Sequence, residues 1–171
     1  STLKEVIKEI EPHLKKDVLV VDVCSVKAYP SRWMKDLLPE TVSILATHPM
    51  FGPDSASDSL KGRKIFLSRI RAKKKRYQKI KSYLTSKGLI IIESTPEDHD
   101  EQIAISLALT HLIGRTLSEF GAVELNMDTE GYKRLLHILD VVEHDTWQLF
   151  HDMHLYNPYA KKKRIAFMKA M

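Results

Sequence analysis

The stretch VSILATHPMFGPDS, residues 42–55, decides the fold class of this chain. Residues 42–46 form a β-rich run, and the prolines and the glycine that follow interrupt regular structure. We therefore expect a parallel strand that ends in an irregular loop, with His48 where the strand passes into the loop. Ligands of open α/β sheets bind outside the carboxyl ends of such strands, so His48 is a candidate catalytic group. A turn that holds an incidental histidine is the alternative.

Apolar runs on both sides of this stretch extend the pattern. Residues 17–23, DVLVVDV, are typical of a strand buried on both faces in a parallel sheet. The predicted strands cover residues 17–23, 42–46, 64–68 and 89–92, and the predicted helices cover about residues 3–16, 26–38 and 72–86. Strands that alternate with helices predict an α/β layer with right-handed crossovers.

The pattern changes near residue 94, after which only helical periodicity is found. One long helix is expected over residues 97–120, closed by Gly121, and a second helical stretch from about residue 128 should break near Glu143. The chain is therefore predicted to be α/β followed by all-α, with domains at 1–94 and 95–171. Apolar residues on more than one face of the later helices predict that this part dimerises.

The composition is that of a globular protein, with 43% hydrophobic and 29% charged residues among 171. A single cysteine, Cys24, excludes an internal disulfide framework and fits a reducing compartment, so we expect the cytoplasm. No apolar run approaches the length of a membrane span, and the acidic N-terminal helix is neither a signal nor a transit peptide. The chain begins at Ser1 instead of a methionine, which indicates processing or trimming.

The net charge of +5 is concentrated in two segments. Residues 61–84 hold eleven Lys or Arg and no acid, and residues 161–164 read KKKR. Such patches can bind nucleic acid, but a charge run on a helix is more often its solvated face, which is our expectation here. No metal site is expected, because the spacing of the C-terminal histidines is not that of zinc ligands. These histidines are His137, His144, His151 and His154.

Other polar residues could act together with His48. Ser25 follows the first predicted strand and should reach the same crevice, where a hydroxyl can orient an imidazole. A serine nucleophile and an ordinary helix N-cap are the alternatives, although no G-x-S-x-G elbow is present. His111 and Arg115 share one face of a largely apolar helix, which indicates contact with an anion, a partner chain or each other. A core histidine is the alternative for His111.

Four segments together resemble a known family. They are DVCSVK (22–27), THPMFGPDS (47–55), EDHDEQIAISLALTHLIGR (97–115) and the stretch 129–157. They resemble the prephenate/arogenate dehydrogenases of tyrosine biosynthesis, most closely the plant-type arogenate dehydrogenases. The resemblance implies a Rossmann-type dinucleotide domain, a helical dimerisation domain and NAD(P)-dependent oxidative decarboxylation of a cyclohexadienyl substrate.

The resemblance also implies roles for residues at the strand ends. His48 corresponds to the histidine that takes the proton of the substrate ring hydroxyl. Ser25 corresponds to the serine that contacts this histidine and the nicotinamide, and Pro49 belongs to the cofactor-binding positions. An acidic side chain at Asp54 or Asp58 should favour arogenate, which carries an ammonium where prephenate carries a ketone.

For the substrate, the resemblance implies that His111 lines the pocket and that Lys133 lies near a carboxylate-binding position. The arginine that some members use there is not matched, and Arg115, Arg134 and His137 are its candidate replacements. The glycine-rich turn is absent from the 171 residues, so NAD and NADP cannot be distinguished. A catalytically silent relative acting as an interaction dimer, or less favourably a nucleic-acid binder, is the alternative function.

Overall fold

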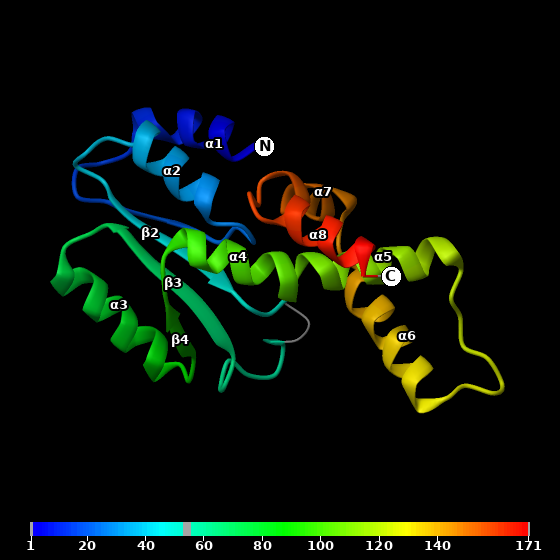
Figure 1. Ribbon diagram of the computed structural model, residues 1–171. Coiled ribbons are helices and arrows are strands. Elements are labelled where there is room, and N and C mark those ends of the chain that lie inside the picture. The colour runs from blue at the N-terminus through cyan, green and yellow to red at the C-terminus, as the bar shows by residue number, and fades with distance from the viewer. Residues whose placement is uncertain (1, 53–55, 171) are drawn as a thin grey trace. The chain divides into compact units, whose positions relative to one another are not determined.

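The structure, a computed structural model, describes residues 2–52 and 56–170. The chain forms two compact units, residues 1–99 and residues 100–171 (Figure 1). Among the described residues, no helix combines the length and the apolar character that crossing a membrane requires. The two units are described in turn.

A four-stranded sheet organises the first unit. Its strands are β1 (Leu19–Asp22), β2 (Ser43–Pro49), β3 (Lys64–Arg71) and β4 (Ile90–Glu93), in the spatial order β1-β2-β3-β4. The expected parallel pairing holds for β1 with β2 and for β3 with β4, but β2 and β3 are antiparallel, so the sheet is mixed. The reason lies in the connection over residues 50–63, whose described part contains no α-helix, whereas a parallel crossover needs a long connection.

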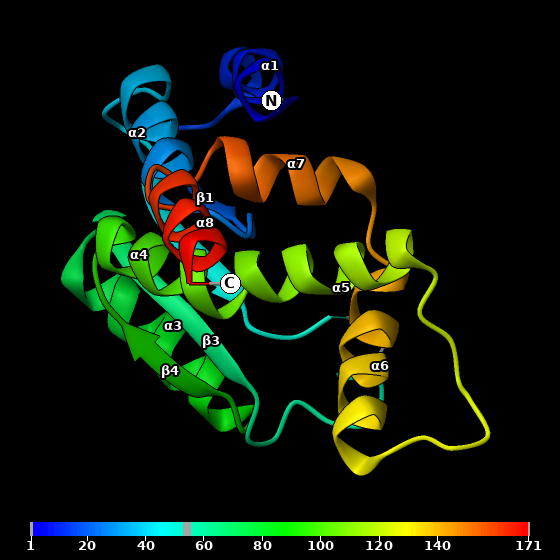
Figure 2. The same cartoon turned by 45° about the vertical axis from the view of Figure 1, so that its right-hand side comes forward.

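Helices cover both faces of this sheet, as Figures 1 and 2 show. They are α1 (Thr2–Ile10) with the short 3₁₀ turn η1 (Glu11–His13), α2 (Ala28–Leu37) and α3 (Lys74–Ser86). Ile44 of β2 packs on one face with Ile7 of α1 and Met34 of α2. Leu45, the next residue, packs on the other face with Tyr77 of α3. Successive strand residues point to opposite faces, so β2 is buried from both sides.

The second strand runs further than predicted. We expected it to end at residue 46, but His48 pairs with Phe66 and Pro49 with Ile65 in the antiparallel ladder. The backbone N–H of Met50 still donates to Lys64 at 2.9 Å. His48 therefore lies within β2 and not in a loop. Pro49 is tolerated at the strand end because proline costs a ladder only where its missing N–H is needed.

Five helices follow, and the first of them crosses the boundary between the units. They are α4 (Pro96–Ser106), α5 (Ala108–Phe120), α6 (Glu130–Glu143), α7 (Trp147–Leu155) and α8 (Ala160–Lys169). The prediction of a single helix over 97–120 is wrong, because the helix is interrupted at Leu107. The ending at Gly121 is confirmed, with φ of +76°, and so is the break near Glu143. The next helix, α7, begins after Thr146, which is its N-cap.

In the second unit, α5 and α6 pack closely and cross each other (Figure 2). Gly114 makes this approach possible, because a Cβ added there would lie 2.3 Å from Cγ2 of Val142. Val142 has no exposed surface. The absence of a side chain at Gly114 therefore sets the distance between the two helices.

Candidate functional site

A buried ion pair joins the carboxyl ends of β1 and β2. The Lys27 ammonium contacts the Asp22 carboxylate and donates to the backbone carbonyl of Thr47 at 2.5 Å. The Thr47 hydroxyl in turn donates to the carbonyl of Asp22 at 2.6 Å. Lys27 is completely buried and Asp22 is 6% exposed. Three residues, one from each of two strands and one from the loop between β1 and α2, therefore hold the backbone immediately before His48.

This brace was not predicted from the sequence, although its residues lie in the DVCSVK and THPMFGPDS segments. Lys27 was read only as part of a family motif. The usable signal was the acid at the end of a buried strand followed five residues later by a lysine. A lysine can reach back to such an acid when a tight turn joins the strand to a helix, as the turn of residues 23–27 does here.

His48 stands directly after this brace and is 7% exposed. Its Nδ1 lies 2.9 Å from Nε2 of His99, and the two rings meet edge to face with centroids 5.2 Å apart. Burial, with smaller contributions from the nearby His99 and Lys27, lowers the pKa of His48 to about 3. The imidazole is therefore neutral at physiological pH.

His99 comes from the first turns of α4 and is 4% exposed. Its ring packs against Phe66 of β3 with centroids 4.4 Å apart. Phe66 is also the strand partner of His48, so one aromatic side chain and one helix confine the histidine pair. The contact joins residues 51 positions apart, and no local sequence signal indicated it.

The other described residues predicted at the strand ends are more exposed than His48. Ser25 is half-buried in the turn after β1. Within residues 2–52 and 56–170, it makes no hydrogen bond to His48, whose Nδ1 faces His99. Pro49 is the half-buried last residue of β2. Asp58 is exposed on the connection to β3, and Asp54 lies outside the described residues.

In the second unit, His111 and Arg115 meet around Asp145. Nε2 of His111 lies 3.4 Å from the Asp145 carboxylate, and the Arg115 guanidinium donates to the Asp145 backbone carbonyl. The same guanidinium stacks 4.6 Å from the centre of the Trp147 ring. Burial lowers the pKa of His111, Asp145 raises it, and Arg115 lowers it. Both side chains therefore contact Asp145, as two residues on one helix face can.

Two nitrogens of this cluster are open to a ligand: the Nε–H of Arg115 is a donor, and Nδ1 of the neutral His111 is an acceptor, because the Nε2 of that ring faces Asp145. Nδ1 of His111 and Nε of Arg115 are buried and have no hydrogen-bond partner in the described part of the chain. Buried polar groups are normally paired, so such atoms often mark a place where a ligand or water binds. Lys133, Arg134 and His137 are instead exposed on α6, where Lys133 pairs with Glu130 at 2.9 Å.

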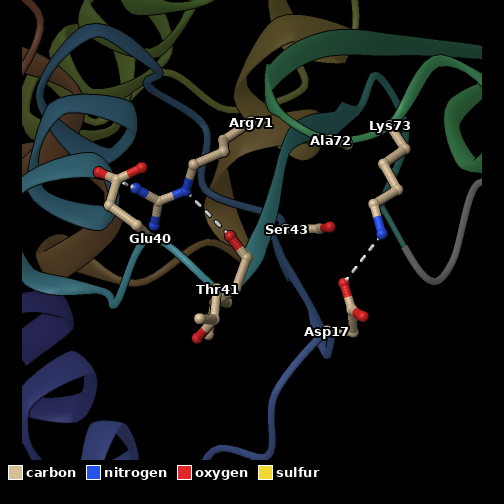
Figure 3. Close-up of a pocket in the computed structure, with 8 residues that line it drawn as sticks. Asp17, Glu40, Thr41, Ser43, Arg71, Ala72 and Lys73 are labelled. Atoms are coloured by element: carbon tan, nitrogen blue, oxygen red, sulfur yellow. Dashed lines mark hydrogen bonds and ion pairs between the residues drawn. The ribbon is translucent and has the colours of Figure 1, made fainter.

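Much of the basic segment is used inside the first unit. The Arg71 guanidinium donates to Glu40 and to the backbone carbonyls of Leu38, Pro39 and Val42 at 2.7–2.9 Å. These contacts line a cavity of about 320 Å³ at the end of the sheet where β2 begins, away from His48 (Figure 3). The cavity is lined by Asp17, Glu40, Thr41, Val42, Ser43, Arg71, Ala72 and Lys73. It contains no histidine, cysteine or other strong nucleophile.

Metal-ligating side chains are not clustered in the described residues. No group of three or more His, Cys, Asp or Glu residues is arranged to hold a metal ion in the part of the chain that the structure describes. His154 contacts the Arg164 guanidinium at 3.1 Å and the Phe150 ring at 4.5 Å. Burial, with a smaller contribution from Arg164, lowers the pKa of His154 to about 4. The side chain is therefore a packed, neutral histidine.

Comparisons with known proteins agree with this arrangement. Residues 1–93 match a family described as prephenate dehydrogenase, nucleotide-binding domain, and residues 116–171 match one described as TYRAAT1-like, C-terminal domain. Arogenate dehydrogenase 2, chloroplastic, of Arabidopsis thaliana is 34% identical over 152 residues, which cover 86% of this chain. A protein of Methanocaldococcus jannaschii named probable arogenate/prephenate dehydrogenase is 30% identical over 182 residues, covering 98% of this chain.

The fold is shared with a solved structure. Prephenate dehydrogenase from A. aeolicus, in complex with hydroxyphenyl propionate and NAD+, superposes with a TM-score of 0.75 at 22% identity. That match covers 99% of this chain and 62% of the other. The matches cover only 42% of the Arabidopsis relative and 39% of the Methanocaldococcus relative. The chain therefore spans about two fifths of the length of these relatives.

Proposed function

This chain belongs to the prephenate dehydrogenase family, and from that premise we propose that it provides the base-bearing part of an NAD(P)-dependent prephenate or arogenate dehydrogenase. The observation that carries the proposal is His48, a buried and neutral imidazole in β2 beside the carboxyl end of β1. The ion pair of Lys27 with Asp22 holds the backbone before it. A general base has to be both unprotonated and fixed in place, and His48 meets both requirements.

In the proposed reaction, the substrate ring carbon that bears the hydroxyl loses a hydride, the hydroxyl loses its proton, and a carboxylate leaves as carbon dioxide. The ring becomes aromatic as a result. His48 takes the hydroxyl proton. A bound nicotinamide cofactor would supply the hydride acceptor. The anionic substrate raises the pKa of His48 from its unliganded value, because a nearby negative charge favours the imidazolium, and this strengthens the base.

The cofactor would be held in this chain at its nicotinamide end only. Ser25 and Pro49 are the proposed contacts, and they follow β1 and end β2 at the same edge of the sheet. The buried Oδ1 of Asp22 has no hydrogen-bond partner in the described part of the chain and could accept a bond there. No G-x-G-x-x-G turn occurs in the 171 residues, so they do not supply the usual pyrophosphate contact. The choice between NAD and NADP depends on the residues that contact the ribose of the cofactor.

The substrate carboxylates are proposed to bind in the helical unit. Arg115 offers its buried, unpaired Nε–H, a donor that suits a carboxylate, and Nδ1 of the neutral His111 lines the same place as an acceptor. Lys133, Arg134 and His137 are kept as exposed candidates. Asp58 and Asp54 are proposed to favour arogenate through its ammonium group. We expect Asp58→Asn to reduce the preference for arogenate over prephenate, and an unchanged preference would remove Asp58 from the proposal.

A catalytically silent relative that acts as an interaction dimer is the second candidate, and the exposed apolar side chains of the second unit favour an interaction role. Titration of the purified chain with NAD and with NADP, each with and without prephenate, separates the two. Binding of either cofactor supports the dehydrogenase. Failure of both to bind at about millimolar concentration, far above the range of ordinary dehydrogenase substrates and cofactors, supports the silent form. Salt-sensitive binding to an arbitrary DNA duplex would instead favour a nucleic-acid binder.

Homodimerisation and a cytoplasmic location complete the proposal. The second unit exposes large apolar side chains, among them Phe120 (82%), Met127 (93%) and Leu155 (69%), which supports a partner of the same kind. The cytoplasm rests on Cys24 being the single cysteine of the sequence, which excludes an internal disulfide and fits a reducing compartment. Fractionation of cells that express the native gene would test the compartment.

A further inference from the structure

The hydrogen bond between the two buried histidines determines which nitrogen of His48 can act. Nδ1 of His48 and Nε2 of His99 are 2.9 Å apart, so one of them must donate and the other accept. We propose that His99 is the positioning residue of His48: Nδ1–H of His48 donates to Nε2 of His99, and the lone pair on Nε2 of His48 stays free for the substrate hydroxyl. This inference rests on the proposed function of His48.

Only this arrangement leaves His48 a base. A neutral imidazole carries one N–H and one lone pair, and the nitrogen without hydrogen is the acceptor. In the reverse arrangement, Nε2–H of His99 would donate to Nδ1 of His48. The hydrogen of His48 would then sit on its Nε2, and this nitrogen could only donate to a substrate. The proton position therefore decides whether the site removes a proton or merely hydrogen-bonds.

The surroundings of His99 are built to hold its ring. Pro96 begins α4, and the backbone N–H of His99 donates to Thr95 at 3.0 Å, which places this residue in the first regular turn. The ring of Phe66, which belongs to β3, contacts the ring of His99. Because His48 and Phe66 are paired across β2 and β3, the three rings form one packed group. A ring confined in this way can orient its neighbour, as the partner of a catalytic or metal-bound histidine commonly does.

The electrostatics of the pair agree with one hydrogen between the two nitrogens that face each other. The pKa of His48 is lowered to about 3, so at physiological pH its ring has one N–H and no charge. Protonation of both rings would place two like charges within hydrogen-bond distance in a buried site, which is strongly unfavourable. With His48 neutral, the hydrogen between the two rings lies either on Nδ1 of His48 or on Nε2 of His99, and the environment of the pair sets the choice.

Long-range ¹H–¹⁵N correlation spectra of the uniformly labelled chain read this choice directly, because protonated and unprotonated ring nitrogens resonate far apart. We expect His48 to show a protonated Nδ1 and an unprotonated Nε2 in the native chain. In His99→Leu, which removes the acceptor, both nitrogen resonances of His48 should shift toward their average as the two tautomers mix. His99→Gln keeps an acceptor in its amide oxygen and should retain the native pattern.

The matched control is His13→Leu, which removes an exposed histidine of the same unit and should leave the His48 resonances unchanged. A protonated Nε2 on His48 in the native chain, or an unchanged His48 pattern in His99→Leu, would overturn the proposal. If His99→Leu does not fold, the native chain and His99→Gln still decide. In a turnover assay, His99→Leu should lower kcat by about 10²-fold with little change in KM.

These spectra require neither cofactor nor turnover. A protonated Nδ1 on His48 together with absent cofactor binding would leave the positioning role in place and remove the dehydrogenase. Cofactor binding together with a protonated Nε2 would do the reverse. The two proposals therefore fail separately.

Discussion

His48 and Lys27 are both ionisable and both buried, but their neighbours differ. Lys27 forms an ion pair with Asp22 and donates to the Thr47 carbonyl. His48 faces another histidine and a nearby ammonium, and burial holds it neutral. A charged brace beside an uncharged ring is a common way for a site to fix the protonation state of its base.

The lowered pKa of His48 predicts a pH-dependent stability of the first unit. Below about pH 6.5 the unfolded chain protonates this imidazole, whereas the folded ring stays neutral down to about pH 3. Folding therefore loses stability as the pH falls through that window, by about 1.4 kcal/mol per pH unit for this group. We expect His48→Gln to lose less stability than the native chain between about pH 7 and pH 5.

Urea unfolding measures this effect, with a Trp147→Phe background so that Trp33 alone reports the first unit. Native and His48→Gln curves that fall in parallel with pH would contradict the buried neutral state. His154 adds a loss of the same sign in the second unit, and the Trp33 signal keeps it apart.

At the scale of elements, β2 is the part on which the site depends. Its apolar run made a strand at residues 42–46 predictable, and so were most helices, because periodicity and end signals are local. The antiparallel pairing with β3 was not predictable, since the pattern of one strand does not specify its partner's direction. Without β3, nothing indicated that the strand continues through His48 to Pro49. His99 was missed as a contact for the same reason: α4 brings it across 51 residues.

The ion pair that joins the ends of β1 and β2 should be costly to break from one side. Lys27→Met leaves the Asp22 carboxylate buried without a partner, and we expect a loss of about 3–5 kcal/mol in the free energy of unfolding. The double variant Lys27→Met with Asp22→Leu removes both charges and should recover much of that loss. Urea unfolding followed by Trp33 fluorescence checks both, and an additive loss in the double variant would show that the residues do not interact.

The contact between α5 and α6 gives a prediction for the second unit. Gly114→Ala places a Cβ against Val142, and we expect a loss of about 1–3 kcal/mol from overpacking. Gly131→Ala is the matched control, because its nearest neighbour atom lies 3.9 Å away and alanine favours a helix by about 1 kcal/mol. Trp147 fluorescence during unfolding reports this unit. Equal stability of the two variants would contradict the close approach.

At the scale of the whole molecule, each unit carries its own set of proposed functional residues. The first unit holds the base, and the second holds the buried His111 and Arg115. The family resemblance made both sets of residues predictable, whereas the brace and the histidine pair required coordinates.

The exposed apolar side chains of the second unit predict self-association. We expect light scattering at micromolar concentration to give the mass of a dimer, and Phe120→Glu to shift the mass toward the monomer, because a buried unpaired charge opposes association. Lys161→Glu changes the charge of an exposed polar position and should leave the mass unchanged. A native chain that is monomeric throughout would contradict this prediction.

The central claim is that His48 is the base of a dehydrogenase, and reduction of NAD or NADP measured by absorbance tests it most directly. With prephenate or arogenate present, the native chain should form the reduced cofactor, and His48→Gln should do so about 10²–10⁴-fold more slowly while remaining folded. Equal rates in the native chain and His48→Gln, or no reduction by the native chain with either cofactor and either substrate, would contradict the account.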